Sequence, residues 1–116
     1  MRINITARRF KLSNELKDYV EKEVLRLKKY FDGIIDVVVI LSWEKMDRLA
    51  EVKLFVHNAV LTAHERSSDM YKSVDSTVEK IEKQLRKYKG KIRDFEHESM
   101  AKAQLSDMEF NHINEE

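Results

Sequence analysis

Residues 67–93 read SSDMYKSVDSTVEKIEKQLRKYKGKIR, and this stretch decides how the rest of the chain must fold. Its apolar residues recur at alternating steps of three and four, a spacing that puts them on one face of an α-helix. They are Tyr71, Val74, Val78, Ile81, Leu85 and Tyr88. The pattern predicts a long amphipathic helix with Ser68 as its N-cap and Gly90 near its end. Such a helix needs a hydrophobic core to cover, and the remaining chain must supply it.

The opposite face of this helix is basic. At about 100° per residue, its cations fall within roughly 120° of arc, away from the apolar stripe. They are Lys72, Lys80, Lys83, Arg86 and Lys87, with Lys91 continuing the series. Asp75, Glu79 and Glu82 gather on one flank. A charged face of this kind is either simply solvated or binds a polyanion, and the separation of acids from bases favours the second interpretation.

Length and composition indicate a single domain. The chain has 116 residues, of which 42% are hydrophobic, enough for a modest core. It has no cysteine, which excludes disulfides and thiolate chemistry. The amino terminus lacks the apolar run of a secretory signal, and no stretch approaches the length of a membrane span. We therefore expect a cytoplasmic protein that does not bind membranes.

The net charge of +1 is an average of two unlike segments. Residues 1–95 hold 21 Lys and Arg against 15 Asp and Glu, a net of +6, whereas residues 96–116 hold 1 against 6, a net of −5. This division predicts a domain over residues 1–95 and an acidic, flexible C-terminal tail over residues 96–116. The basic domain is the part that we expect to meet a polyanion.

A strand and a helix are predicted before the central part of the chain. Residues 2–8 alternate apolar and polar side chains, as in a strand. Ser13 or Asn14 is expected to cap the helix that follows, and Gly33 to end it. Its inward stripe is Leu16, Val20, Val24, Leu27 and Phe31, and its outward face carries Lys22, Arg26 and Lys29.

Three further strands complete the expected fold. Residues 35–43 form an apolar, β-branched run typical of a central strand, and residues 44–49 are expected to be a loop. Residues 50–57 and 60–66 read as a hairpin that turns at Asn58 and Ala59. The order β-α-β-β-β-α predicts an α+β fold with two helices on one face of a four-stranded, mostly antiparallel sheet. This order resembles double-stranded RNA binding domains, which read RNA by its shape.

Two aromatic residues, Trp43 and Tyr71, could be either buried in the core or exposed to a ligand. Trp43 continues the inward alternation of its strand, and Tyr71 begins the apolar stripe of its helix. Aromatic rings near cations can stack on nucleic-acid bases, but at these spacings packing into the core is the stronger expectation. Met70 is expected to pack in the same way.

No catalytic constellation emerges from the sequence. His57, His64, His97 and His112 are too dispersed for a metal motif, and the two glycines cannot form a phosphate-binding loop. Acidic pairs such as Glu79 and Glu82 alternate with lysines on a helix and are expected to form ion pairs. We therefore predict a protein that is not an enzyme, with no cofactor, no metal site and no small-molecule substrate.

The basic surface carries the functional expectation. Two helices on the same face of a sheet would turn both rows of cations outward and make one wide electropositive strip, which engages phosphates by charge and shape. The leading hypothesis is a protein that binds a polyanion through this strip. The alternative is a protein-interaction module that modulates a regulatory protein through its sheet face and acidic tail.

The chain also resembles a known family in four motifs. They are NIT followed by ARRFKLS, LKKYFDG at the end of the first helix, DMYKSVD, and VEKIEKQLRKYKGK. These motifs, spread over residues 1–93, are similar to the ribosome hibernation promoting factors, a family that includes the ribosome-associated inhibitor and was once labelled as sigma-54 modulation proteins. Asn58-Ala59 departs from the Asn-Gly of many members.

The resemblance implies a translation inhibitor of resting or stressed cells. It implies binding to the rRNA of the small ribosomal subunit, in the channel used by mRNA and tRNA. Independently of the resemblance, a monomer off the ribosome is the simplest expectation. The family's rRNA-contacting cations fall on Arg26, Lys29, Lys80, Lys83 and Lys87, and Arg86 joins them. The chain resembles either a short member with an acidic tail or the first domain of a long member, and nothing in it resembles the dimerisation domain of long members.

Overall fold

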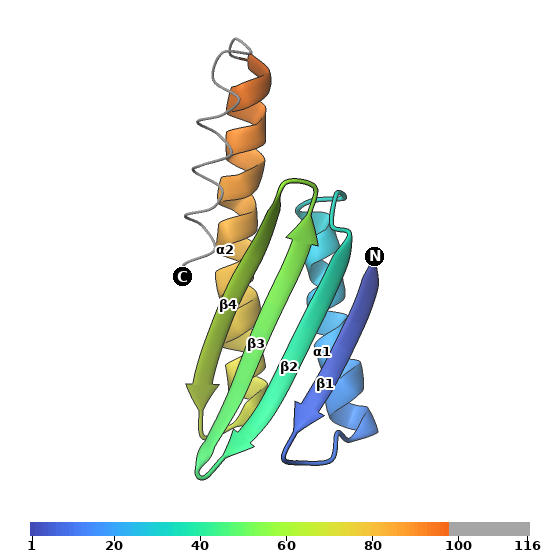
Figure 1. Ribbon diagram of the computed structural model, residues 1–116, viewed down its shortest axis with the longest axis vertical. Helices are drawn as coiled ribbons and strands as arrows, with labels where there is room; N and C mark the ends of the chain where they lie inside the picture. The colour runs from blue at the N-terminus through green and yellow to red at the C-terminus, as the bar shows by residue number, and fades with distance from the viewer. Residues whose placement is uncertain (98–116) are drawn as a thin grey trace.

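The computed structural model describes residues 1–97, with side chains described as far as Gly90. The predicted order β-α-β-β-β-α is confirmed, with a 3₁₀ turn, η1, added after the first helix (Figure 1). The elements are β1 (Arg2–Arg8), α1 (Asn14–Leu25), η1 (Arg26–Lys29), β2 (Asp36–Glu44), β3 (Asp47–Val56), β4 (Ala59–Ser67) and α2 (Met70–His97). The predicted acidic tail, residues 96–116, lies outside the described residues except for the last two residues of α2.

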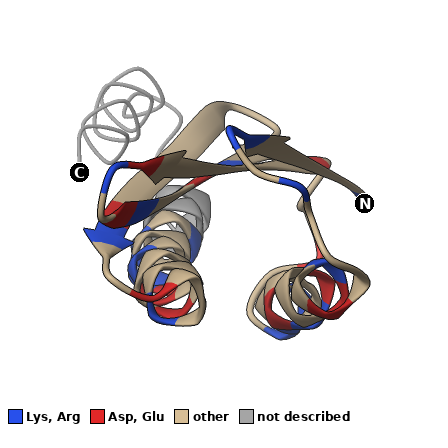
Figure 2. Ribbon diagram, turned by 90° about the horizontal axis from the view of Figure 1, so that it is seen from below, with Lys and Arg blue, Asp and Glu red and all other residues tan. Residues whose placement is uncertain are grey.

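The four strands form one mixed sheet in the order β1-β2-β3-β4. β1 pairs with β2 in parallel, whereas β2 with β3 and β3 with β4 pair in antiparallel fashion. A parallel pair needs a crossover connection, and α1 with η1 supplies it. Figure 2 shows α1 and α2 on the same side of the sheet, so the predicted α+β arrangement is confirmed.

The first hairpin is tighter than the sequence suggested, and the second turns at a different position. Lys45 and Met46 alone join β2 to β3, so the loop expected over residues 44–49 is mostly strand. Lys45 adopts a left-handed conformation with φ of 55°, as a two-residue turn between twisted strands often requires. His57 and Asn58 join β3 to β4, one residue earlier than predicted, because Val56 pairs with Ala59.

The core lies between the sheet and the two helices. Burying each large apolar side chain there contributes roughly 1.5–3 kcal/mol. The helices contribute Leu16, Val20, Val24, Leu27, Val74, Val78, Ile81, Leu85 and Tyr88, and the sheet contributes Val37, Val39, Leu41, Ala50, Val52, Leu54, Leu61 and Ala63. These are the inward stripes expected from the sequence, and Met70 is buried as predicted.

Trp43 and Tyr71 are exceptions, and the prediction that they pack in the core is wrong. Trp43 is 42% exposed and Tyr71 is 40% exposed. Trp43 follows the last fully buried apolar residue of β2 and lies two residues from the hairpin turn, where its ring meets Phe10 from the segment between β1 and α1. Tyr71 lies in the first turn of α2, where its ring forms a T-shaped pair with that of Tyr19 on α1.

The caps of the two helices are clear. Ser13 caps α1, since its Oγ accepts a hydrogen bond from the Leu16 N–H at 3.1 Å. Asp69, and not Ser68, caps α2, because its Oδ1 accepts from the Tyr71 N–H at 2.9 Å. An aspartate at this position also places a negative charge at the positive end of the helix dipole.

Neither glycine ends a helix in the way the sequence suggested. α2 continues past Gly90 to His97, and Gly33 does not adopt the left-handed conformation of a C-cap, because no described glycine has a positive φ. Gly33 is instead required by a close contact: a Cβ atom there would lie 2.5 Å from Cε2 of Phe31. Phe31 meets Tyr88 edge to face at 5.4 Å, which restricts how far its ring can move.

This difference predicts opposite effects for two alanine substitutions. We expect Gly33→Ala to lower the free energy of unfolding by about 1 kcal/mol, because the new methyl group overpacks against Phe31. Gly90→Ala should raise it by up to about 1 kcal/mol, since nothing lies within 4 Å and alanine favours the helix. Urea unfolding of both variants measures these changes, and equal effects of the two substitutions would contradict the account.

Candidate nucleic-acid interface

The first row of cations lies on α1 and η1. Val20, Val24 and Leu27 point into the core, so Lys22, Arg26 and Lys29 point away from the sheet, and all three are exposed. Arg26 forms an ion pair with Glu23 at 3.0 Å. Lys22 and Lys29 make no ion pair with any of the side chains described within residues 1–90.

The second row lies on α2, where the sequence predicted Lys72, Lys80, Lys83, Arg86, Lys87 and Lys91. The first five point away from the core, and all except Lys80 are exposed. Lys80 pairs with Glu65 of β4, Lys83 lies 3.8 Å from Glu79, and Arg86 lies 2.8 Å from Glu82. Lys72 has no such partner among the described side chains. The backbone of Lys91 belongs to α2, but its side chain lies outside the description.

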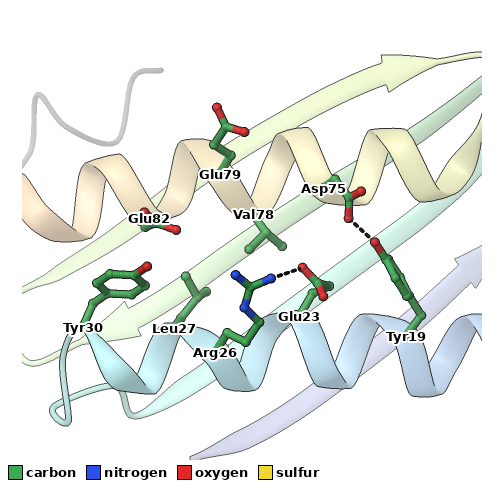
Figure 3. A pocket seen from close by; sticks show the side chains of 9 residues that line it. All are labelled: Tyr19, Glu23, Arg26, Leu27, Tyr30, Asp75, Val78, Glu79 and Glu82. Carbon is green, nitrogen blue, oxygen red and sulfur yellow. Dashed lines mark hydrogen bonds and ion pairs between the residues drawn. The ribbon is translucent and has the colours of Figure 1, made fainter.

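An acidic groove of about 320 Å³ lies between the two helices (Figure 3). Its residues are Tyr19, Glu23, Arg26, Leu27, Tyr30, Asp75, Val78, Glu79 and Glu82. Four carboxylates thus line it against one guanidinium. The acidic flank that the sequence identified on α2 is the flank that faces α1. The prediction of one continuous basic strip is therefore wrong, because carboxylates separate the two rows.

Two contacts cross this groove and hold the rows in register. The Tyr19 hydroxyl on α1 donates a hydrogen bond to Asp75 on α2 (Figure 3). At the other end, the Arg86 guanidinium lies 5.2 Å from the centroid of the Tyr30 ring, a cation–π contact. Arg86 is thus the cation of α2 that reaches across to the segment following η1, and it links the two rows where the acids would otherwise divide them.

The hydrogen bond to Asp75 raises the pKa of Tyr19 to about 12, with smaller contributions from burial and from nearby carboxylates. Because folding raises this pKa above the usual value of 10.0, the stabilisation is fully present below about pH 10 and is lost as the pH rises towards 12.

Replacing Tyr19 tests this bond. We expect Tyr19→Phe to lower the free energy of unfolding at neutral pH by about 0.5–1.5 kcal/mol. The difference from the unmodified protein should shrink between pH 10 and 12, as measured by urea unfolding across that range. Tyr30→Phe is the matched control, since no described residue bonds its hydroxyl. A difference that stays constant with pH would contradict the assigned bond.

Four residues near the start of both helices, two exposed and two half-buried, were not recognised from the sequence as one group. Phe10, Trp43, Arg48 and Tyr71 come from four different segments of the chain, and the structure brings them to one end of the molecule. The exposed fractions of Trp43 and Tyr71 depend on where the helices begin over the sheet. Sequence periodicity carries no signal for this.

The part of the chain that the structure describes offers neither a metal site nor a membrane-spanning helix. Within residues 1–97, no three His, Cys, Asp or Glu side chains are grouped so that they could hold a metal ion. No helix in that range is both long enough and apolar enough to cross a membrane.

The chain is similar in sequence to a known protein family and to several proteins of one name. Residues 3–93 match the family described as Sigma 54 modulation protein / S30EA ribosomal protein. The chain is 36% identical over 91 residues to the ribosome hibernation promoting factor of Azotobacter vinelandii, covering 78% of this chain and 85% of the relative. It is 31% identical over 93 residues to the protein of the same name from Escherichia coli K12, covering 80% and 98%.

Two solved structures share the fold. A ribosomal subunit interface protein from Coxiella burnetii matches with a TM-score of 0.74 and 30% identity, over 78% of this chain and 99% of the other. The N-terminal domain of Thermus thermophilus Protein Y matches with a TM-score of 0.71 and 28% identity, over 76% and 99%. Neither match bears on the resemblance to double-stranded RNA binding domains, which stays a prediction. The family match covers more than three quarters of the sequence, and the chain belongs to the Sigma 54 modulation protein / S30EA ribosomal protein family.

Proposed function

We propose that this protein is a ribosome hibernation factor that binds the small ribosomal subunit and inhibits translation. The supporting observation is the pair of cation rows on α1 with η1 and on α2, both exposed on the same side of the sheet. Relatives with 31–36% identity are named ribosome hibernation promoting factors. A rigid surface with two basic rows suits the folded backbone of rRNA, because it engages phosphates without reading bases.

In this proposal the two rows bind rRNA in the channel used by mRNA and tRNA. The exposed ammonium groups of Lys22, Lys29 and Lys72 are free to contact phosphates. Lys83 and Arg86 can exchange their exposed partners Glu79 and Glu82 for phosphates at little cost, since surface ion pairs contribute little to stability. The groove acids repel phosphate, which would keep the two rows on separate backbone segments. Occupying the channel would exclude mRNA and tRNA, so no catalytic step is needed.

The protein is further proposed to act in the cytoplasm and to be a monomer away from the ribosome. Chemical probing of the small-subunit rRNA, with and without the protein, tests the location directly. We expect protection of nucleotides that line the mRNA and tRNA channel. Protection elsewhere would contradict the proposed site. A partner captured in high salt after nuclease treatment would instead support the alternative, a protein-interaction module.

A further inference from the structure

A hollow of about 390 Å³ lies where α1 and α2 begin, apart from the groove between the helices. Leu16 and Met70 are its buried apolar residues. Three aromatic side chains from three segments of the chain line it, namely Phe10, Trp43 and Tyr71. We call it the aromatic hollow.

One wall of the aromatic hollow is a preassembled stack. The rings of Phe10 and Trp43 are nearly parallel, with an angle of 4° between their planes and 5.0 Å between their centroids. The Arg48 guanidinium lies 4.2 Å from the centroid of the Trp43 ring. Arg48 also donates hydrogen bonds to the carbonyls of Lys45 and Asp47, each at 3.2 Å, so its position is fixed by backbone.

Tyr71 is the other aromatic wall. Its ring and the Tyr19 ring form a T-shaped pair with 4.9 Å between their centroids, and the Tyr71 side chain remains 40% exposed. Asp69 is the one carboxylate that lines the hollow, and it is engaged as the cap of α2. Lys11 also lines the hollow and forms no ion pair with the side chains described in residues 1–90.

These features together suit one kind of ligand. Flat exposed rings stack on nucleobases, whose two faces are equally flat, and adjacent cations bind the phosphate that each nucleotide carries. The described charges in the hollow are two cations, Lys11 and Arg48, and one capping carboxylate, so the hollow is electropositive. An acidic or purely apolar peptide would leave either the rings or the cations without a matching group.

We propose that the aromatic hollow binds an unpaired nucleotide of a single-stranded RNA segment. The base stacks on the exposed ring of Tyr71, beside the Phe10–Trp43 stack, and Lys11 and Arg48 hold its phosphates. This inference rests on the proposed binding to rRNA but assigns a second contact, at the end of the molecule where the helices begin. It also assigns a function to the exposed rings of Trp43 and Tyr71.

Trp43 is the only tryptophan in the chain, so its fluorescence reports on the hollow. The isolated protein is titrated with short oligouridylate, with inorganic polyphosphate of matched charge, and with uridine monophosphate. We expect oligouridylate to quench the fluorescence of Trp43 more strongly than polyphosphate does, because only the oligonucleotide can stack. Equal quenching by polyphosphate would overturn the proposal, and equal quenching by the monophosphate would indicate a site for free nucleotides instead.

Variants of the aromatic residues test the contribution of stacking. Tyr71→Ala should weaken binding of oligouridylate about tenfold, whereas Tyr71→Phe, which keeps the ring, should bind normally. Trp43→Leu should weaken the binding of oligouridylate to a similar extent. The fluorescence anisotropy of labelled oligouridylate measures the binding of every variant. Met46→Ala is the control, because Met46 is 83% exposed on the hairpin between β2 and β3 and does not line the hollow. Urea unfolding shows whether both variants are folded. If both are, and Tyr71→Ala binds oligouridylate as tightly as Met46→Ala does, the proposal is wrong.

A crosslinking experiment on the small subunit distinguishes this inference from the proposed function. Tyr71 is replaced by the photocrosslinker benzoylphenylalanine, and the protein is irradiated on the small subunit. Crosslinks to rRNA support the proposal, and crosslinks only to a ribosomal protein overturn it. A protein that does not sediment with small subunits at all would refute the proposed function, whatever oligouridylate does to Trp43.

Discussion

We expect Lys83→Glu combined with Lys87→Glu to abolish binding to the small ribosomal subunit while leaving the fold intact. Both residues are exposed on α2 and contribute nothing to its buried face, so the helix should remain in place. The change removes two cations and adds two anions to a surface proposed to lie on phosphates. Each phosphate contact contributes to a steep salt dependence, so losing two and adding repulsion should weaken binding roughly a hundredfold or more.

Co-sedimentation with purified small subunits over a series of salt concentrations measures this effect. The matched control is Arg2→Glu with Lys53→Glu, which makes the same change in net charge away from the helices and from the aromatic hollow, on β1 and β3. The control should sediment like the unmodified protein. If both double variants lose binding equally, net charge and not the α2 row is responsible. If neither loses it, the assignment of the surface is wrong.

The opposite change in the acidic groove should strengthen binding. Glu79 and Glu82 line the groove, and each pairs with a cation of the α2 row, Lys83 and Arg86 respectively. Replacing both acids with glutamine removes their repulsion of phosphate and releases the two cations. At roughly 0.7 kcal/mol for each charge at about 6 Å in water, we expect an affinity about tenfold higher, with a steeper dependence on salt.

The control for this variant removes the same charge elsewhere. Glu44→Gln with Glu51→Gln alters β2 and β3 and leaves the groove unchanged. Small-subunit affinities of both double variants, measured at one ionic strength, decide between local and global effects. Unchanged affinity on neutralising the groove would mean that its carboxylates do not face the rRNA. The salt slopes of the two double variants provide an independent comparison.

Much of the fold could be predicted because its signals are periodic. The stripe from Val74 to Tyr88 needs only the helical repeat to identify the buried face of α2, and the alternation in β2 identifies Val37, Val39 and Leu41 in the same way. Where prediction failed, the deciding contact was remote. Gly33 is a glycine because of the ring of Phe31, and Trp43 is exposed because it lies at the end of β2, where Phe10 and Arg48 meet its ring.

The candidate site also has one part that sequence spacing predicts and one part that depends on remote contacts. Every cation of both rows except Lys91 could be assigned to an outward helix face from spacing alone, and the structure puts them there. The groove could not be foreseen, because its acids become important only when the α2 flank that bears them faces α1. The bond from Tyr19 to Asp75, across 56 positions of sequence, has no local signature.

By itself, the sequence determined the order of strands and helices, the buried and exposed faces of each, and membership of the family, because these depend on residues close together in the chain or on motifs. Only the tertiary structure decided how those faces meet: two cation rows separated by carboxylates, joined by Arg86 at one end, and an aromatic hollow where the helices begin. The physical reason is that packing of two helices on a twisted sheet sets their rotation and offset. That geometry brings Tyr71 and Trp43 to a common hollow at the surface instead of into the core.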